Sequence, residues 1–587
     1  MDLSKSELRL IEVEKGLAAA FIGGRGLGVK VVYDHAPRRA SPLHPSTPLV
    51  FAVGPLTATC FPSSSRACVV SKSPLTGTIF DSNVGGGLGL ALRKTGLDAI
   101  IVLGSSKELL ALVIDEGEPR LVDASWLKGS STKDTLNALR KDLGEDFEVA
   151  CVGPAGENAV RLACICAGRG HVAGRGGLGA VMGGRGLKAL AVRGSREVEV
   201  ADEEGLRRLS LSVARRLRSN PITGKALPNL GTSFLLAVVN EHGMLPSYNY
   251  SRLGFEEAYR VSAESYAVLH GRRRPCPGCF IACKRDLNLD GLEVPQPEFE
   301  SIWSLGPLCG LADPAKVAEL NELCNELGLD SISMGATLAC YIELSQRGLV
   351  EERVEWGDAE AMRRLIEDAA HRRGAGSKLA EGSRRLAEAV GLPEASVSVK
   401  GLELPAYDPR AAYGQALSYA TSNRGGCHLR AYLVASELLG VPILLDRLSA
   451  LGKADLVAHF EDLMAAVDSL IVCKFLALEL DDEVFAEALR HATGLAYDRA
   501  SFMEAGERIW NLERLFNLEE GFDLSHDTLP ERVLKDPRAP PLSEMLREYY
   551  EARGWTIRGE PRRSKLEKLG LPGDKVKLGG RGEGGGL

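Results

Sequence analysis

Short apolar runs between glycine-rich turns dominate the first two hundred residues of the chain. Continuous runs of this length, rich in valine and isoleucine and bounded by turn residues, are typical of buried strands. We predict five such strands, within LVFAVGP (49–55), DAIIVLG (98–104), LALVID (110–115), EVACVGP (148–154) and KALAVRG (188–194). Residues 1–200 are therefore expected to form a β-rich domain.

This region also contains an internal repeat. GGLGLALRKTGLDAIIV (86–102) aligns without a gap to GGLGAVMGGRGLKALAV (176–192), and eight of the seventeen positions are identical. Each copy follows a Val-Gly-Pro segment, at Val53 and Val152, and an Ala-Cys pair, at Ala67 and Ala163. A repeat of this length predicts two similar half-domains related by a pseudo-two-fold axis. Such a platform could hold two copies of one ligand, or one ligand with two similar halves.

From about residue 201 the apolar positions recur at helical spacing. The clearest segments are 202–219, 314–328 and 358–374, followed later in the chain by 460–478 and 502–518. We expect one mainly helical domain over 201–400 and a second over 401–587. The polar, glycine-rich end of the chain, about 573–587, is expected to be disordered.

Composition and charge narrow the class of protein. The 587 residues carry a formal net charge of −7, which is too mild to indicate nucleic acid or a membrane surface as a partner. The N-terminus lacks the basic and apolar regions of a signal peptide, and no uninterrupted apolar run approaches the roughly 18 residues of a membrane span. We therefore expect a cytoplasmic protein whose thirteen cysteines are reduced thiols. Its three glutamines are a weak sign of a thermophilic source.

Three cysteines lie close together in RPCPGCFIACKRD (274–286). Cys276, Cys279 and Cys283 have C-x2-C-x3-C spacing, which is typical of iron–sulfur clusters that take one further ligand from elsewhere. A four-cysteine zinc site usually has two C-x2-C pairs, and the chain has no second pair, so we favour a cluster over zinc or coincidence. Spacing alone leaves the fourth ligand open among Cys309, Cys324, Cys427 and Cys473.

Three glycine-rich stretches are candidates for phosphate-binding loops, GGRGLG (23–28), GGGLG (85–89) and GRGGLG (174–179). The first follows a helical pattern rather than a strand, so it is not a Rossmann fingerprint. Each stretch could simply form a tight turn. The repeat favours phosphate binding at the second and third, because Arg66 and Arg175 lie near them and arginine suits phosphate.

Two further groups of residues have catalytic potential. Glu298 and Glu300 in PEFES share one face if that segment is extended, and His428 follows Cys427 in RGGCHLR. Solvated carboxylates and a structural histidine are the alternative readings. The residues alone thus predict an iron–sulfur protein with a two-part anion-binding platform.

Taken together, ten stretches of the chain resemble the aldehyde ferredoxin oxidoreductase family, the tungsten-dependent bis-pyranopterin enzymes. They occur in the family's order and cover almost the whole chain. They are SKSPLTG, SNVGGGLG, GPAGEN, AGRGGLGAVMG, CPGCFIAC, PEFESIWSLG, NELGLDSIS, LELPAYDPR, NRGGCH and ERIWNLERLFNL.

The resemblance implies an α+β fold, in which a pseudo-two-fold β-base carries two pyranopterins and is followed by two mainly helical domains. It implies tungsten, or molybdenum in its place, held by the pterin dithiolenes, and one 4Fe–4S cluster. Mg²⁺ bridging the pterin phosphates is a further expected ion. DSLIVC matches the segment that supplies the fourth cluster ligand, which the resemblance assigns to Cys473.

The family's motifs also assign residues to the pterins. The matching positions are Arg66, Asn83, Gly85, His171, Arg175, Gly176, Asn325, Asp330, Ser331, Arg430 and Asp468. Two of them depart from the family pattern. His171 stands where the family has arginine, so its phosphate contact is expected to depend on pH. Asn325 stands where the family has aspartate, and it keeps hydrogen bonding without the charge.

The activity implied is oxidation of a small aldehyde to the carboxylic acid, with electrons leaving through the cluster to ferredoxin or to a separate ferredoxin-like subunit. Glu300 would act as general base and His428 would hydrogen-bond the reacting oxygen. Two alternatives stay open: a same-fold enzyme that reduces an activated acid or aromatic thioester, and an electron-transfer subunit without pterin. A homo-oligomer is compatible with the resemblance. In some members of the family a glutamate and a histidine bind a metal ion that bridges a dimer. Here Glu319 matches the glutamate but Arg363 replaces the histidine, so we expect that bridge to be absent.

Overall fold

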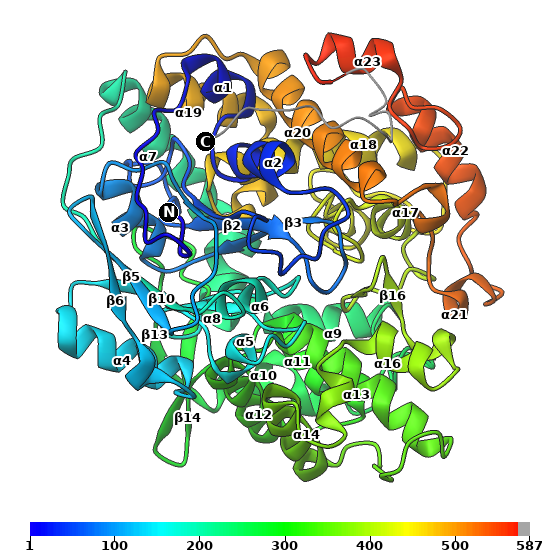
Figure 1. Ribbon diagram of the computed structural model, residues 1–587. Helices are drawn as coiled ribbons and strands as arrows, with labels where there is room; N and C mark the ends of the chain where they lie inside the picture. The colour runs from blue at the N-terminus through cyan, green and yellow to red at the C-terminus, as the bar shows by residue number, and fades with distance from the viewer. Residues whose placement is uncertain (573–587) are drawn as a thin grey trace.

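The computed structural model describes residues 1–572, so the predicted disordered tail, 573–587, lies outside the described residues. Figure 1 shows three regions along the chain. The sheets of the N-terminal region, in blue and cyan, lie on the left and in the centre, the green helices lie below, and the yellow to red helices lie across the top and at the right. The mixed α+β architecture that the sequence predicts is confirmed.

Two sheets form the N-terminal region. The first has the strand order β3 (Ile79–Val84), β2 (Ala67–Lys72), β1 (Leu49–Ala52) and β4 (Ala99–Val102), all antiparallel. The second has the order β6 (Glu118–Asp123), β5 (Leu110–Asp115), β10 (Leu187–Arg193), β7 (Glu148–Cys151), β8 (Ile165–Ala167) and β9 (Val172–Ala173). All five predicted strands are present, and β10 and β5 are the parallel pair.

The internal repeat appears in the topology of the two sheets. The order β3-β2-β1-β4 of the first sheet matches β9-β8-β7-β10 of the second, with antiparallel pairing throughout both sets. In each copy a short helix precedes the last strand, α3 (Leu88–Lys94) before β4 and α6 (Leu178–Gly183) before β10. The hairpin of β5 and β6 and the helix α4 (Thr132–Leu143) are insertions in this scheme.

The first sheet is buried on both faces, which explains its continuous apolar runs. Side chains alternate across it, so that Val50 and Val70 pack with α2 (Gly24–His35), while Phe51 and Val69 point into the main core. The predicted absence of a Rossmann motif at 23–28 is consistent with this arrangement, because α2 follows the helix α1 (Lys15–Phe21) rather than a strand.

The middle region is mainly helical, as predicted. Its principal helices are α7 (Glu203–Ser219), α11 (Phe299–Leu305), α12 (Pro314–Leu327), α13 (Ser331–Gln346) and α14 (Ala359–His371). Asp313, Asp330 and Asp358 cap three of them by accepting backbone N–H groups of the first turn. A three-stranded sheet, β13 (His270–Arg273), β14 (Arg285–Leu289) and β15 (Leu292–Pro295), projects from these helices, and the cysteine loop connects β13 to β14.

The last region is built on α17 (Tyr413–Thr421), α18 (Lys453–Leu470), α20 (Arg499–Glu519) and α22 (Leu542–Ala552). The prediction of a helix through residue 478 is wrong, because α18 ends at Leu470. Ile471 has a left-handed φ of 59°, and the Cys473 N–H then donates to the Ser63 carbonyl at 3.0 Å. The break lets this segment reach the N-terminal region.

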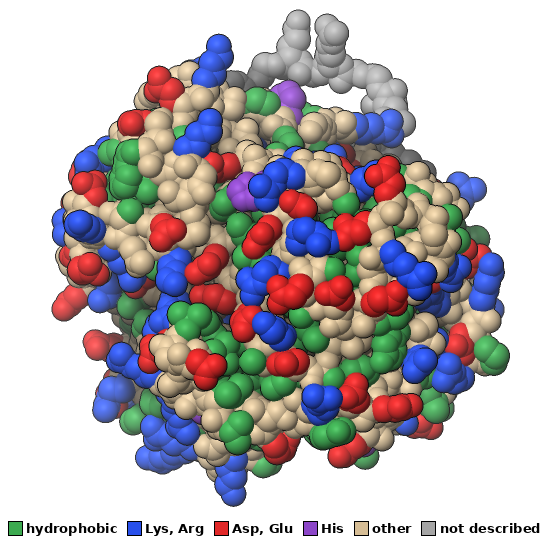
Figure 2. Space-filling model, turned by 90° about the horizontal axis from the view of Figure 1, so that it is seen from below, with side chains coloured by type: hydrophobic (Ala, Val, Ile, Leu, Met, Phe, Trp, Pro, Cys, Tyr) green, Lys and Arg blue, Asp and Glu red, His purple; other side chains and the backbone are tan. Residues whose placement is uncertain are grey.

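One helical stretch, 222–241, has the length and mean hydropathy of a membrane span. Lys225, Asn229 and Asn240 interrupt it, so it is not an uninterrupted apolar run. It is divided among four short elements, and Pro228 and Gly231 lie at their junctions. Figure 2 shows one face of the molecule, on which acidic and basic side chains are interspersed.

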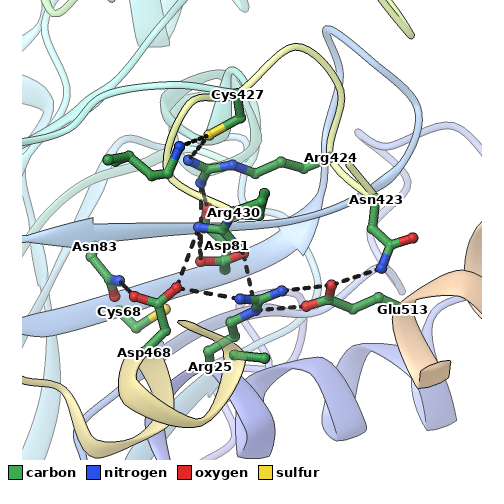
Figure 3. A network of polar contacts seen from close by, with 12 residues as sticks. Arg25, Cys68, Asp81, Asn83, Asn423, Arg424, Cys427, Arg430, Asp468 and Glu513 are labelled. Atoms are coloured by element: carbon green, nitrogen blue, oxygen red, sulfur yellow. Dashed lines mark hydrogen bonds and ion pairs between the residues drawn. The ribbon is translucent and has the colours of Figure 1, made fainter. Parts of the chain in front are cut away.

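A buried ion network connects the N-terminal region to the last one (Figure 3). Arg25 of α2 donates to both carboxylate oxygens of Glu513 on α20, each at 2.8 Å. Arg25 also lies 3.3 Å from Asp468 on α18 and 3.5 Å from Asp81 on β3. Its side chain is completely buried. Together these contacts hold α2, α18 and α20 at fixed positions relative to the first sheet.

Arg25→Met is expected to lower the free energy of unfolding by about 3–5 kcal/mol, because three buried carboxylates lose a shared cation. Lys30→Ala is the matched control on the same helix, where an exposed pair with Asp34 contributes only about 0.3–0.5 kcal/mol. Denaturant-induced unfolding followed by circular dichroism compares the two variants. Equal losses in both would show that the network adds no stability.

Candidate active site between the three regions

A cavity of about 370 Å³ lies where the three regions meet. Its wall contains fifteen of the seventeen residues that the sequence singles out, all except Gly176 and Asp468. The N-terminal region contributes Arg66, Asn83, Gly85, His171 and Arg175, the middle region contributes Cys276, Cys279, Cys283, Glu300, Asn325, Asp330 and Ser331, and the last region contributes His428, Arg430 and Cys473.

Gly176 and Asp468 lie behind this wall and act on it indirectly. Gly176 has a φ of 87° and its Cα faces the Phe80 ring, so a side chain there would clash, and the turn it forms presents Arg175. Asp468 is fully buried and accepts a hydrogen bond from the Asn83 amide at 2.7 Å. Asp468 therefore positions Asn83, which does line the cavity.

The four cysteines form one end of the cavity. Within the loop, Arg274 N–H donates to Lys284 O at 2.9 Å and Cys279 N–H to Cys276 O at 3.1 Å, so the turn is closed at its base and its tip. Gly86 N–H and the Ser63 hydroxyl donate to the sulfurs of Cys276 and Cys279, at 3.5 and 3.3 Å.

Cys473 joins these three from the last region. Burial raises the pKa of the Cys473 thiol to about 11 against the opposing effect of Arg66, and the nearby Cys279 and Cys276 raise it further. Of the other candidates for a fourth ligand, Cys309 and Cys324 are buried in the core and do not line the cavity. Within residues 1–572 no group of three or more His, Cys, Asp or Glu side chains is close enough together to hold one metal ion.

Glu300 and His428 form a pair in another part of the wall. Glu300 lies in the first turn of α11, where its Oε2 accepts the Ala406 N–H at 2.9 Å. Its Oε1 lies 3.7 Å from His428 Nδ1, and neither of these two buried atoms has a hydrogen-bond partner. The rings of Tyr407 and Tyr432 flank the imidazole at 5.9 and 6.0 Å.

This pair is uncharged near neutral pH. Burial raises the pKa of Glu300 to about 8, against the Ala406 N–H and Arg175, which lower it. Burial also lowers the pKa of His428 well below its ordinary value, and the nearby Arg175, Arg424 and Lys474 act in the same direction. A neutral acid and a neutral imidazole thus share a site from which most water is excluded.

PEFES is not extended throughout, so the condition under which Glu298 and Glu300 would share one face is not met. Glu298 precedes the first residue of α11, and Glu300 is already helical. Glu298 instead accepts the Thr232 hydroxyl at 2.7 Å and pairs with Lys284 at 3.0 Å. Both carboxylates still line the cavity, but they lie in different environments.

His171 faces Gly85, and the space between them is narrow. Burial lowers the pKa of its imidazole to about 2, and Lys284, Arg66 and Arg274 contribute in the same direction. In the protein without ligands the ring is therefore neutral across the physiological range, and the predicted pH dependence of a contact there has no support. Lys284 and the arginines supply the positive charge instead.

Arg175 and Asp330 connect all three regions at the third glycine-rich stretch, 174–179. Arg175 donates to the carbonyls of Glu403 and Gly426, at 2.8 and 3.1 Å, and lies 3.4 Å from the Asp330 carboxylate. Asp330 also caps α13 by accepting the Ile332 N–H at 3.0 Å. Asn325, at the end of α12, lines the same part of the cavity.

Sequence reasoning did not single out two charged residues here, Arg424 in the wall and Asp81 behind it. Asp81 pairs with Arg430 at 2.7 Å, and Arg424 donates to Cys427 Sγ at 2.8 Å. Although burial opposes it, Arg424 and Arg430 lower the pKa of the Cys427 thiol to about 7. Asp81 immediately precedes the motif SNVGGGLG, and Arg424 lies inside NRGGCH, so the motifs themselves were the available signal.

Several buried polar atoms around the cavity have no partner within the protein. They include Ser65 Oγ, Asn83 Oδ1, Glu300 Oε1, Arg424 Nε, His428 Nδ1 and Arg430 Nε. Buried polar atoms are almost always hydrogen-bonded in folded proteins. Their concentration here indicates that the cavity takes a polar ligand.

At the position considered for a dimer-bridging ion, Arg363 pairs with Glu319 at 3.0 Å.

Comparison with known proteins gives a consistent result. The family model for the N-terminal domain of aldehyde ferredoxin oxidoreductase matches residues 1–194, and that for its domains 2 and 3 matches residues 208–571. The chain is 40% identical to the tungsten-containing aldehyde ferredoxin oxidoreductases of Pyrococcus furiosus and Thermococcus kodakarensis, over 97% of this chain and 98% of each relative.

A solved structure has the same fold at lower sequence identity. It is the active site complex BamBC of benzoyl coenzyme A reductase with 1,5-dienoyl-CoA, at a TM-score of 0.86 and 24% identity over 97% of this chain and 96% of that one. With both family models matching in order and 40% identity over nearly the full length, the chain belongs to the aldehyde ferredoxin oxidoreductase family.

Proposed function

We propose that this protein oxidises an aldehyde to the carboxylic acid and passes the electrons through an iron–sulfur cluster to a ferredoxin. The observation that carries the proposal is the single cavity that holds the unpartnered Glu300–His428 pair and the four cysteines. The printed names of the 40% identical relatives, tungsten-containing aldehyde ferredoxin oxidoreductases, support it.

The residues of the cavity fit a tungsten bis-pyranopterin. Asn83, Arg66 and the loop at Gly85 would hold one pterin, while Arg175, Asn325 and Asp330 would hold the other, with Mg²⁺ between their phosphates. When bound, the cofactor supplies the two-electron redox centre and its own sulfur ligands, which accept molybdenum as well as tungsten. The unpartnered amide and guanidinium atoms are the groups that pterin rings and phosphates would satisfy.

The cysteines fit a 4Fe–4S cluster. Cys276, Cys279 and Cys283 would supply three ligands and Cys473 the fourth. Arg66 lies among them, and the charges of Cys473, Cys276 and Cys283 all raise its pKa. One guanidinium would thus touch both the cluster end and the pterin end of the cavity.

The reaction converts an aldehyde and water to a carboxylic acid, two protons and two electrons. Glu300 would remove a proton from the water oxygen that attacks the aldehyde carbon, using Oε1, while the Ala406 N–H holds Oε2 in place. His428 would hydrogen-bond the carbonyl oxygen as negative charge develops on it. The rings of Tyr407 and Tyr432 fix the imidazole and exclude bulk water.

Two measurements test this proposal and its alternatives. Elemental analysis of anaerobically purified protein should find one tungsten or molybdenum and about four irons per chain, the content of a single cluster. The protein should also reduce a viologen dye when an aldehyde is added. Iron without tungsten or molybdenum would favour the electron-transfer subunit. No response to aldehyde, together with oxidation of reduced viologen when an activated acid or aromatic thioester is added, would favour the same-fold reductase.

Glu300→Gln is expected to keep its tungsten and iron but to lose about 10²–10⁴-fold in aldehyde turnover, the usual contribution of a general base. Aldehyde-dependent viologen reduction and metal content are measured on the same preparation. Because glutamine keeps the size and the contact with Ala406, turnover close to that of the wild type would remove Glu300 from the mechanism.

The pH dependence follows from the raised pKa of Glu300. The base acts only when it is deprotonated, so kcat/KM for the aldehyde should rise with pH and level off above about 8. Histidine would not produce this limb, because the pKa of His428 is lowered and its imidazole is already neutral. The rising limb should be absent from the residual activity of Glu300→Gln.

Cys473→Ser is expected to lower the iron content and to remove the broad visible absorption of the cluster, because one of four ligands is lost. Cys60→Ser is the control, since Cys60 is an exposed thiol outside the cavity wall. Iron per chain is measured in both variants. An unchanged value in Cys473→Ser would exclude it as the fourth ligand.

A further inference from the structure

The cysteine loop reaches the molecular surface. Pro277 and Gly278, at the tip of the turn, are exposed, and Cys276 and Cys279 are only half-buried. Phe280 is 45% exposed, although it follows Cys279 directly. Packing within the protein does not explain why this large apolar side chain is exposed. It lies where the cysteine end of the cavity comes close to solvent.

Three exposed arginines lie next to the loop, one against Phe280 and two on the strand that enters the loop. Arg218, near the end of α7, lies with its guanidinium 4.6 Å from the centre of the Phe280 ring. Arg272 and Arg273 are exposed on β13, the edge strand that leads directly into the loop. We refer to Arg218, Arg272, Arg273 and Phe280 as the loop collar.

The arginines of the collar lack acidic partners within the described part of the chain. Arg273 donates to the Asn229 side chain at 3.1 Å, and none of the three has a carboxylate within 4.0 Å. The acidic residue next to the loop, Asp286, is fully buried and already pairs with Arg274. The collar therefore presents uncompensated positive charge.

Some other exposed arginines do have acidic partners. Arg207 and Arg208, on the same helix as Arg218, both pair with Glu204, at 3.0 and 3.4 Å. Figure 2 likewise shows a face where acidic and basic side chains alternate, and the chain as a whole carries a net charge of −7. Unpaired like charges side by side repel one another, so the collar costs stability unless a partner of opposite charge binds there.

We propose that the loop collar is the docking surface for a small acidic electron-carrying protein of the ferredoxin class. The proposal rests on the proposed function, which requires an acceptor for electrons that leave through the cysteine end of the cavity. The arginines would steer an acidic carrier toward the loop, and Phe280 would supply an apolar contact at its centre. Each docking event transfers one electron, so two carriers are reduced for each aldehyde oxidised.

The shape of the collar also fits a transient complex. Three charges and one aromatic ring at and beside the cysteine loop form a small contact, and electron-transfer complexes have small interfaces that dissociate quickly. Charged residues at the rim of such an interface act mainly on the rate of association, and their effect is screened by salt. The interaction should therefore weaken strongly as ionic strength rises.

The test uses the holoenzyme and a purified acidic 4Fe–4S ferredoxin. The variant is Arg218→Glu/Arg272→Glu/Arg273→Glu, and its control is Arg353→Glu/Arg364→Glu/Arg384→Glu. The control arginines are also exposed, but they lie around α14 and α16, away from β13 in Figure 1, and they pair with acidic neighbours. Ferredoxin binding is measured by biolayer interferometry at low and high ionic strength, and aldehyde oxidation is assayed with ferredoxin and with benzyl viologen.

The collar variant should keep its iron content and its viologen rate, while ferredoxin binding and reduction fall by at least about 10-fold at low salt. The control should resemble the wild type in every assay, and the difference between wild type and variant should shrink at high salt. Wild-type ferredoxin binding in the collar variant would overturn the proposal, as would an equal loss in the control.

Two safeguards keep the result interpretable. If charge reversal lowers the iron content, the neutral variant Arg218→Gln/Arg272→Gln/Arg273→Gln is used instead. It must show an intermediate loss of ferredoxin binding. Unchanged binding in this variant would overturn the proposal. The direct binding measurement needs no aldehyde. A wild-type protein that binds ferredoxin through the collar but does not oxidise aldehydes would overturn the proposed function and leave the docking surface standing.

Discussion

Buried charge at the junction of the three regions is the constraint on which the rest of the structure depends. Four cations, Arg25, Arg424, Arg430 and Lys474, meet three carboxylates, Asp81, Asp468 and Glu513, in the wall of the cavity or directly behind it. Ions in such a position are stable only when they are paired in good geometry, so helices distant in the chain must meet at defined positions. The same pairs that assemble the fold also shape the cavity.

This set of charges is not fully balanced within the protein. Burial lowers the pKa of Lys474 to about 8, in spite of Asp468, and Arg430 and Arg25 add to this effect. A partly anionic Cys427 next to Arg424 compensates in part. The remaining excess of positive charge faces the cavity, together with Arg66 and Arg175, and this is the field that phosphate groups of a cofactor would complete.

The sequence predicted what local pattern determines and missed what distant contacts determine. The five strands, the repeat and the principal helices follow from apolar periodicity, and the motifs identified most of the cavity wall. The ion pair of Arg25 with Glu513 joins residues 488 positions apart, and no local signal reports it. The end of α18 at Leu470 has a similar cause, because the tether from Cys473 to Ser63 overrides a continuous helical pattern. Glu298 and Glu300 lie in different environments because α11 begins one residue after Glu298.

The two halves of the proposed reaction need opposite surroundings, and one cavity provides both. Proton transfer through Glu300 requires a site with little water, since burial is the main cause that raises its pKa to about 8 and keeps His428 neutral. Electron transfer to a protein requires the opposite, a redox group close to solvent, and the cysteine loop with its exposed Phe280 meets this need. Arg66 lies between the two ends, among the cysteines and beside the loop at Gly85. This separation would let electrons leave through the surface at the cysteine end. The carboxyl–imidazole pair stays shielded from solvent, which would otherwise return the two pKa values toward their ordinary range.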